Sequence, residues 1–296
     1  MSREQILEGL NPAQMEAVSQ VDGALLIIAG PGSGKTKVIV HRIANLIRSA
    51  GINPHSICAV TFTNKAAKEM RDRLALLLGS TTSNDIAAGT FHSICARILR
   101  IDGKSIGLNN TFSIYDREDQ IATIKESLIR THLDPGQFNP RTVLARISQA
   151  KAKLIDAEGF LAALPGEYWD EIISRVYPVY EGLLQKNQAL DFDDLLLKVH
   201  KLFQADQDVL HKYQNRFPHV LVDEFQDTNI AQYTIARTLA AQSGNICVVG
   251  DPDQAIYGWR NADIRNILMF QNDFPAARVI ILEENYRSTP KILAAA

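Results

Sequence analysis

The stretch Ala24–Thr36, ALLIIAGPGSGKT, decides the fold that this sequence predicts. It begins with a short apolar run, which is typical of a strand buried inside a parallel sheet. A glycine-rich turn follows, and beyond it Val38, Ile43 and Leu46 recur at helical spacing. A strand, a glycine-rich turn and a helix in this order are the context of a phosphate-binding loop. The segment therefore predicts an α/β fold that binds a nucleotide phosphate where the helix begins.

The residue types in this loop indicate how it would bind ATP. Its glycines allow the backbone to direct N–H groups toward phosphate oxygens. Lys35 would reach the β- and γ-phosphates, and the Thr36 hydroxyl would be a ligand of Mg²⁺. The strict motif begins with glycine where this chain has Ala29, which is tolerable because the phosphate-facing glycines come later. The predicted phosphate-binding residues are Ala29, Gly30, Pro31, Gly32, Ser33, Gly34, Lys35 and Thr36.

A second apolar run, HVLVDE at His219–Glu224, ends in two acidic residues. Open α/β sheets bind ligands at the C-terminal ends of their strands. Asp223 suits the Mg²⁺ contact, and Glu224 suits the acceptance of a proton from an attacking water. Each pattern alone has an ordinary explanation, a chance Lys-Thr after a turn or a strand that ends in solvated acids. Together they predict ATP hydrolysis.

Further apolar runs alternate with helical periodicity along the chain. They are Ile57–Phe62, Ile86–Thr90, Ile246–Val249 and Arg278–Leu282. Strands that alternate with helices predict a parallel sheet covered on both faces. We expect Asn64 to cap a helix that ends near Leu78. From about Tyr115 to Asn215 the pattern is mostly helical, which predicts a helical subdomain at 91–215 inserted into an α/β domain formed by 1–90 and 216–280.

Composition narrows the class of protein. The chain has 296 residues, 46% hydrophobic and 22% charged, with a formal net charge of −2, which suits about two globular domains without overall basic character. The cysteines Cys58, Cys95 and Cys247 lie in apolar stretches and match no metal-ligand spacing. The sequence shows neither a signal peptide nor an apolar run long enough to span a membrane. We therefore expect a cytoplasmic protein without a membrane partner.

Four longer motifs make the prediction more specific. They are TFTNKAAKEM, GTFHSICARILR, DEFQD and VVGDPDQAIYGWRNA. With them the sequence closely resembles the UvrD/Rep/PcrA family of superfamily-one DNA helicases, from Leu10 to its last residue. The resemblance implies a RecA-like P-loop NTPase domain that couples ATP hydrolysis to 3′-to-5′ movement along single-stranded DNA, in DNA repair or replication.

The resemblance also assigns contacts to the nucleotide. Gln14, in LNPAQ, looks like the adenine-reading glutamine, whose amide can pair with N6 and N7 of adenine. Gln254 looks like the γ-phosphate sensor. Tyr286 and Arg287, in ENYRST, look like an adenine-stacking tyrosine and an arginine finger. Many relatives have arginine at the position of Lys37, and since lysine gives a weaker, non-planar contact, adenine selectivity is expected to be looser.

A path for single-stranded DNA and its junctions with duplex is implied in the same way. Such a path needs aromatic faces for bases and donors for phosphates, although an isolated aromatic residue more often belongs to the core. The predicted contacts are Phe62, Thr63, Asn64, His92, Tyr257, Trp259 and Arg260. Phe192, in DFDDLL, is a further candidate, and that motif is equally an acidic helix start with an apolar face.

Family members are longer than this chain, with a second RecA-like domain. We therefore expect 281–296 to begin a second motor domain that is cut short, and we expect slow ATP hydrolysis without unwinding. Two alternatives remain open. The ATPase head of a helicase–nuclease subunit shares these motifs, and a non-hydrolysing ATP-binding or partner-docking module would keep the loop without turnover. RNA is a less favoured track, and no predicted contact senses a 2′-hydroxyl.

Overall fold

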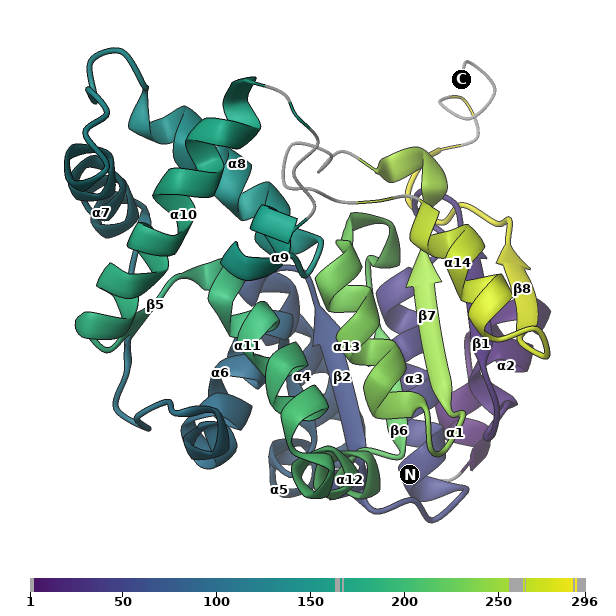
Figure 1. The fold of residues 1–296 in the computed structure, drawn as a ribbon. Helices are drawn as coiled ribbons and strands as arrows, with labels where there is room; N and C mark the ends of the chain where they lie inside the picture. Colours follow the sequence, from purple (N-terminus) through teal and green to yellow (C-terminus); the bar gives the residue numbers. More distant parts are fainter. Residues whose placement is uncertain are drawn as a thin grey trace. The chain divides into compact units, whose positions relative to one another are not determined.

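The structure is a computed structural model that describes residues 3–162, 166, 168–255, 263, 265–289 and 291. The chain forms two compact units, which Figure 1 colours along the sequence. Unit 1 contains Met1–Phe91 and Leu210–Ala296, and unit 2 contains His92–Val209.

Unit 1 is built on a parallel sheet. Among the described residues, six strands pair in the order β3-β2-β6-β7-β1-β8, each parallel to its neighbours. Their bounds are β1 Leu25–Ala29, β2 Ile57–Thr61, β3 Ala87–Thr90, β6 His219–Val222, β7 Ile246–Gly250 and β8 Arg278–Leu282. Of the four inner strands, β2, β6 and β7 are buried along their whole length, and β1 is buried except at Ile28. Continuous apolar sequences of this kind are typical of strands covered on both faces. The predicted parallel α/β sheet is confirmed.

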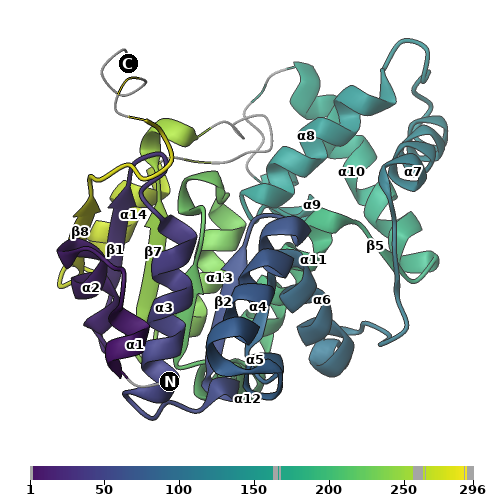
Figure 2. The same cartoon turned by 180° about the vertical axis from the view of Figure 1, so that it is seen from behind.

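Helices cover both faces of this sheet. Figure 1 shows α13 and α14 in front of it, and Figure 2, from behind, shows α3 and α4 over the opposite face. The helices of unit 1 are α1 Arg3–Leu7, α2 Pro12–Ser19, α3 Lys35–Arg48, α4 Asn64–Leu78, α5 Ser80–Asn84, α13 Ile230–Ala240 and α14 Arg265–Asp273. Short 3-10 helices are η1 Pro54–Ser56, η3 Phe225–Asp227 and η4 Pro252–Gln254. Helix α3 packs Val38, Ile39 and Ile43 into the core formed with β1.

The start of α4 corrects one prediction. Asn64, expected as the cap, is the first helical residue, and the Thr63 hydroxyl accepts a hydrogen bond from Ala66 N at 3.1 Å. Because β2 ends at Thr61, only Phe62 separates the strand from the cap, and the extended backbone at Thr63 provides the geometry that a helix cap needs.

Unit 2 is mostly helical. Its helices are α7 Arg117–Arg130, α8 Pro140–Ala152, α9 Ala157–Ala162, α10 Tyr168–Lys186 and α11 Phe192–Ala205, with η2 at Gly103–Ile106. Helices α6 Phe91–Asp102 and α12 Gln207–Arg216 cross the bounds of the units. Two parallel strands, β4 Ser113–Ile114 and β5 Ala189–Leu190, were not predicted, since two residues are too few to show an alternating pattern. Helices α7, α8 and α10 share a core of their own around Ile147, Ile173 and Tyr177.

The burial of the cysteines agrees with the prediction that they are core residues. Cys58, Cys95 and Cys247 are all buried, and burial raises the pKa of the Cys58 thiol to about 12. Across the described ranges, no helix combines the length and the apolar character that crossing a membrane demands.

Candidate nucleotide site

The C-terminal ends of three neighbouring strands bring the predicted loop and acids together in unit 1. Strand β7 lies between β1 and β6, so the loop after β1, the acids after β6 and the residues after β7 meet at one edge. This edge is where open parallel sheets bind ligands. A cavity of about 400 Å³ opens there, a size that suits a nucleotide.

Two glycines shape the loop. Gly32 and Gly34 have φ of 73° and 86°, in the left-handed region that favours glycine. A Cβ added to Gly32 would lie 2.6 Å from Cβ of Arg287 and 2.7 Å from Oδ1 of Asn285. No side chain caps the N-terminus of α3 at Gly34, so the first N–H groups of that helix can serve a bound anion.

Lys35 is buried beside this cavity, with 8% of its surface exposed. Its Nζ donates to the Ala29 carbonyl at 3.4 Å and to Asp251 Oδ2 at 3.3 Å. The ion pair compensates for burying the charge. Because an ammonium has three donors, the third can be given to a phosphate oxygen.

Thr36 and Asp223 lie in direct contact. Thr36 Oγ1 donates to Asp223 Oδ2 at 3.1 Å, and Asp223 N donates to the Val60 carbonyl at 2.9 Å. Burial, and then the charge of Glu224, raise the pKa of Asp223 to about 7, although hydrogen bonds from Glu224 N and Thr36 act the other way. A nearby divalent cation would favour the ionised form.

The Thr36 hydroxyl and the Asp223 carboxylate are ligands that fit Mg²⁺. Within the part of the chain that the structure describes, no group of three or more His, Cys, Asp or Glu could hold a metal ion. Magnesium is usually held by one or two carboxylates, with water and substrate phosphates completing its shell. One carboxylate and one hydroxyl beside a phosphate-binding loop are therefore sufficient.

Glu224 is held in an unusual conformation next to these groups. Its φ of 51° and ψ of 49° are left-handed, which is rare outside glycine and concentrated at functional sites. Gln226 Nε2 donates to Glu224 Oε2 at 2.9 Å, and Asp251 N donates to Gln226 Oε1 at 2.9 Å. Gln254 Nε2 in turn donates to Asp251 Oδ2. The predicted general base and γ-phosphate sensor thus belong to one set of hydrogen bonds.

The segment after β8 lies against the glycine loop. Tyr286 N donates to the Gly32 carbonyl at 2.9 Å, and the Tyr286 hydroxyl accepts from Asn11 Nδ2 at 2.9 Å and donates to Glu284. Tyr286 and Arg287 are exposed and line the cavity. Their position agrees with contacts to a nucleotide, which remain predictions.

Gln14 and Lys37, which are also expected near adenine, have partners within the protein. Gln14 is 1% exposed, and its Nε2 donates to the Ser33 carbonyl at 2.8 Å while its Oε1 accepts from Asn11 N at 3.1 Å. Lys37 Nζ donates to the Gly9 carbonyl at 2.7 Å. Gln14 therefore stabilises the phosphate-binding loop through Ser33. Its contact with adenine remains a prediction.

Sequence reasoning missed several residues of this site. Glu69 and Arg73 of α4 form an ion pair on the cavity wall, and nothing in their spacing distinguishes them from an ordinary helix-surface pair. Asp251 follows β7 directly, so the rule that assigned Asp223 to a strand end could have found it. Gln226 lies in the DEFQD motif, which supported the family resemblance but suggested no role for this residue.

The predicted DNA contacts are only partly described. Phe62 is half-buried, while Thr63 and Asn64 are exposed at the end of β2 in unit 1. Tyr257, Trp259 and Arg260 lie outside the described residues. In unit 2, His92 and Phe192 form an edge-to-face pair with ring centroids 5.9 Å apart, and Phe192 is 48% exposed.

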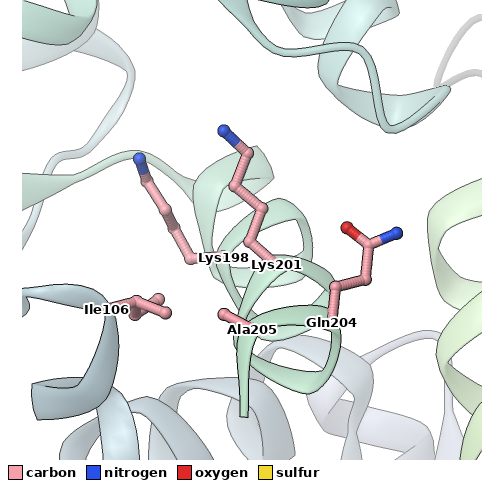
Figure 3. Close-up of a pocket in the computed structure, with 5 residues that line it drawn as sticks. All are labelled: Ile106, Lys198, Lys201, Gln204 and Ala205. Atoms are coloured by element: carbon pink, nitrogen blue, oxygen red, sulfur yellow. The ribbon is translucent and has the colours of Figure 1, made fainter.

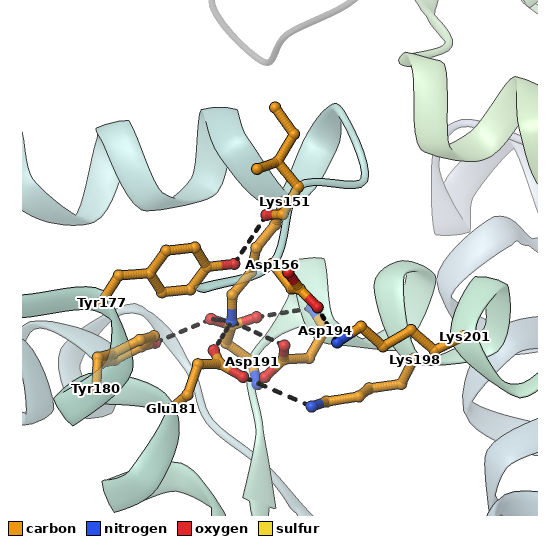
Figure 4. A network of polar contacts seen from close by, with 10 residues as sticks. Lys151, Asp156, Tyr177, Tyr180, Glu181, Asp191, Asp194, Lys198 and Lys201 are labelled. Carbon is orange, nitrogen blue, oxygen red and sulfur yellow. Dashed lines mark hydrogen bonds and ion pairs between the residues drawn. The ribbon is translucent and has the colours of Figure 1, made fainter. Parts of the chain in front are cut away.

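Figure 4 shows a polar network in unit 2 around Lys151, Asp191 and Asp194. Asp191 caps α11 and directly precedes Phe192 in the chain. Lys151 is 0% exposed, and its Nζ donates to Asp191 Oδ2 and Asp194 Oδ1, each at 2.8 Å. Glu181 Oε1 lies 2.6 Å away, an ion pair without hydrogen-bond geometry. Burial favours loss of the Lys151 proton, but the three carboxylates outweigh it and raise the pKa of Lys151 well above its usual value.

A pocket on α11 contains two lysines but is a poorer candidate for anion binding than the phosphate loop. Figure 3 shows Lys198 and Lys201 extending from the helix beside Gln204. Lys198 Nζ lies 3.6 Å from Glu181 Oε2, and Lys201 pairs with Asp156. Because carboxylates already neutralise both lysines, the pocket lacks the excess positive charge that an anion needs.

Comparison with known proteins is consistent with the geometry at the sheet edge. The model of a family described as UvrD/REP helicase N-terminal domain matches residues 10–275. A Bacillus subtilis (strain 168) protein named ATP-dependent DNA helicase PcrA is 52% identical over 292 residues, which cover 99% of this chain and 39% of the relative. Proteins of the same name from Leuconostoc citreum and Staphylococcus aureus (strain Mu50 / ATCC 700699) are each 47% identical, over 100% and 98% of this chain and 39% and 40% of their own lengths. The chain spans about two fifths of the length of these relatives.

Proposed function

The chain belongs to the UvrD/REP helicase family, and from that premise we propose that unit 1 binds ATP with Mg²⁺ and hydrolyses it to drive movement along DNA. The observation that carries the proposal is the convergence of Lys35, Thr36, Asp223 and Glu224 on one cavity at the edge of a parallel sheet. The printed names of the relatives, ATP-dependent DNA helicase, support the same chemistry.

Binding would use the loop and the acid after β6. The N–H groups at the start of α3 and the Lys35 ammonium would hold the phosphates. Thr36 and Asp223 would hold Mg²⁺, which when bound polarises the phosphates and neutralises their charge. Tyr286 would stack on the adenine, with Gln14 and Lys37 beside it.

Hydrolysis would begin at Glu224. Its carboxylate would take a proton from a water whose oxygen attacks the γ-phosphorus, while the bond from that phosphorus to the bridging oxygen breaks and ADP leaves. Lys35 and Arg287 would stabilise the charge that moves to the phosphate oxygens. Gln254 would sense the γ-phosphate.

DNA binding and domain roles extend the proposal. Single-stranded DNA, and junctions with duplex, would contact the end of β2, the His92–Phe192 pair and the segment that contains Tyr257, Trp259 and Arg260, with 3′-to-5′ polarity. The RecA-like domain would comprise 1–90 and 216–280, with 91–215 as an insertion. A second RecA-like domain, expected to start at 281–296, would close over the site. Its expected first residues, Ile281 and Leu282, pair with Ile28 and Ala29 in the sheet of unit 1.

A steady-state ATPase assay of this chain, with and without single-stranded DNA, tests the proposal. We expect slow hydrolysis with little stimulation by DNA, and near-complete loss of turnover in Glu224→Gln with nucleotide binding retained. If Glu224→Gln leaves turnover unchanged, the chain is a nucleotide-binding module rather than an ATPase. Robust stimulation by DNA would contradict the need for a second motor domain.

A further inference from the structure

Gln226 is a buried amide between the ends of β6 and β7, to which the mechanism above gives no role. Its side chain is 1% exposed. The Nε2 atom donates to Glu224 Oε2 at 2.9 Å and to Asp227 Oδ2 at 3.3 Å, and Oε1 accepts from Asp251 N at 2.9 Å. Both ends of the amide are therefore bonded to groups at the nucleotide site.

Packing fixes the orientation of this amide. A Cβ added to Gly250 would lie 3.0 Å from Gln226 Oε1 and 3.2 Å from Gln226 N, so β7 ends directly against it. Phe225, its neighbour in η3, is fully buried and packs edge-on against Tyr233 and Phe270, with centroids 5.5 and 6.0 Å apart. The amide has little room to turn.

The bonds of Gln226 join two parts of the site. On one side is Glu224, in its left-handed conformation. On the other is Asp251, whose Oδ2 accepts from both Lys35 Nζ and Gln254 Nε2. A continuous set of hydrogen bonds thus runs from the general base to two side chains that would face a γ-phosphate.

We propose that Gln226 is a positioning residue that aims the Glu224 carboxylate at the attacking water and couples it to the state of the Asp251 loop. The inference rests on the proposed hydrolytic function. When Lys35 binds a phosphate, its ammonium interacts with both the phosphate and Asp251. The resulting change in the interaction with Asp251 is transmitted through the Gln226 amide to Glu224. Partners of this kind orient a catalytic group without touching the substrate.

Gln226→Glu is the informative variant. It keeps the size and an acceptor for Asp251 N, but it replaces the donor to Glu224 with an anionic oxygen. We expect kcat to fall about 10- to 100-fold, with KM and the Kd of Mg²⁺–ADP changed less than about twofold, because no nucleotide contact is removed.

The matched control is Gln232→Glu, the same change at a residue of 3% exposure in the same unit. Gln232 Oε1 accepts from Asn229 N at 3.0 Å in a capping box, which glutamate also forms, so kcat should be unaffected. On a Glu224→Gln background, Gln226→Glu should cause no further loss of turnover, since it acts through Glu224. The inference is overturned if the two substitutions reduce kcat by factors that multiply. It is also overturned if Gln226→Glu lowers nucleotide affinity instead of kcat.

A measurement without turnover separates this inference from the function it rests on. The side-chain amide signal of Gln226 in ¹⁵N-edited NMR, identified by its absence in Gln226→Leu, should shift in Glu224→Gln but not in Gln232→Glu. It should also shift with the Mg²⁺ complex of β,γ-imido-ATP, and less with Mg²⁺–ADP. An unmoved signal overturns the inference even if ATP is hydrolysed. If the wild-type chain hydrolyses no ATP, the proposed function fails, and the NMR result still decides whether Gln226 links these groups.

Discussion

Two lysines of this chain are buried against carboxylates, with opposite consequences. Lys151 in unit 2 is fully enclosed and lies within 2.8 Å of three carboxylate side chains. Lys35 in unit 1 has one carboxylate partner, Asp251 at 3.3 Å, and borders a cavity of about 400 Å³. A lysine whose surroundings are saturated with acids can only stabilise the fold. A lysine with a spare donor and an open side can bind a ligand.

The largest effect that separates the two sites is expected from Lys151→Met. The substitution leaves Asp191 and Asp194 buried without their cation, while Glu181 is partly exposed and keeps Lys198 as a partner. Removing one partner of a buried ion pair costs about 3–5 kcal/mol. Urea unfolding followed by circular dichroism measures it. Lys153→Met is the control, since Lys153 is exposed two residues further along. A loss below about 1 kcal/mol, the range of exposed pairs, would show that the buried Lys151 pairs stabilise the fold no more than exposed pairs do.

Lys35→Met should produce the reverse pattern. Asp251 keeps the bonds from Gln254 Nε2 and Asp253 N, so Lys35→Met should destabilise unit 1 less than Lys151→Met destabilises unit 2. ATP turnover should fall about 100- to 1,000-fold, the usual loss when a donor to transition-state charge is removed. An ATPase assay paired with urea unfolding checks both parts, with the exposed Lys68→Met as control. Equal destabilisation by Lys35→Met and Lys151→Met would contradict the comparison.

The same two lysines show what sequence could predict. Lys35 was assigned because the strand, the glycines and the helix that define its role are its neighbours in the chain. Lys151 gave no signal, since Asp191 and Asp194 lie 40 and 43 residues away and meet it only after folding. Asp251 is 216 residues from Lys35. The parallel sheet was predictable from local patterns, but partners that only the fold brings together were not.

A pH dependence distinguishes the Lys151 network further. Burial, and then the charge of Asp191, raise the pKa of Asp194 from 3.8 to about 7, with Lys151 opposing and Glu181 adding to the rise. Between pH 3.8 and pH 7, Asp194 holds a proton in the folded state that it has lost in the unfolded chain. The stability that this proton contributes is therefore fully present below pH 3.8 and is lost as the pH rises through 7. For one proton the slope is at most about 1.4 kcal/mol per pH unit.

The test is urea unfolding of the wild type and of Asp194→Asn at pH 6 and pH 8. Asparagine keeps one oxygen for Lys151 or Asp191 N and is uncharged at both values. The contribution of Asp194 to the slope should therefore disappear in the variant. If the wild type and Asp194→Asn lose the same stability between pH 6 and pH 8, Asp194 is already ionised in the folded state over this range and the expected contribution is absent.

The smallest effect concerns a third lysine, between the two extremes. Lys37 is partly exposed, and the partner of its Nζ is a single carbonyl, that of Gly9. If Tyr286 and residue 37 enclose the base, Lys37→Arg should raise the preference for ATP over GTP, because a planar guanidinium stacks on a ring where an ammonium cannot. An exposed cation–π contact contributes about 0.5–1 kcal/mol, which corresponds to a change in the ratio of the two Kd values of about two- to fivefold. Equilibrium binding of both nucleotides to the two proteins measures it, with Lys68→Arg as the matched control on α4. An unchanged ratio would place Lys37 away from the base and leave it as a brace between α3 and the Gly9 carbonyl.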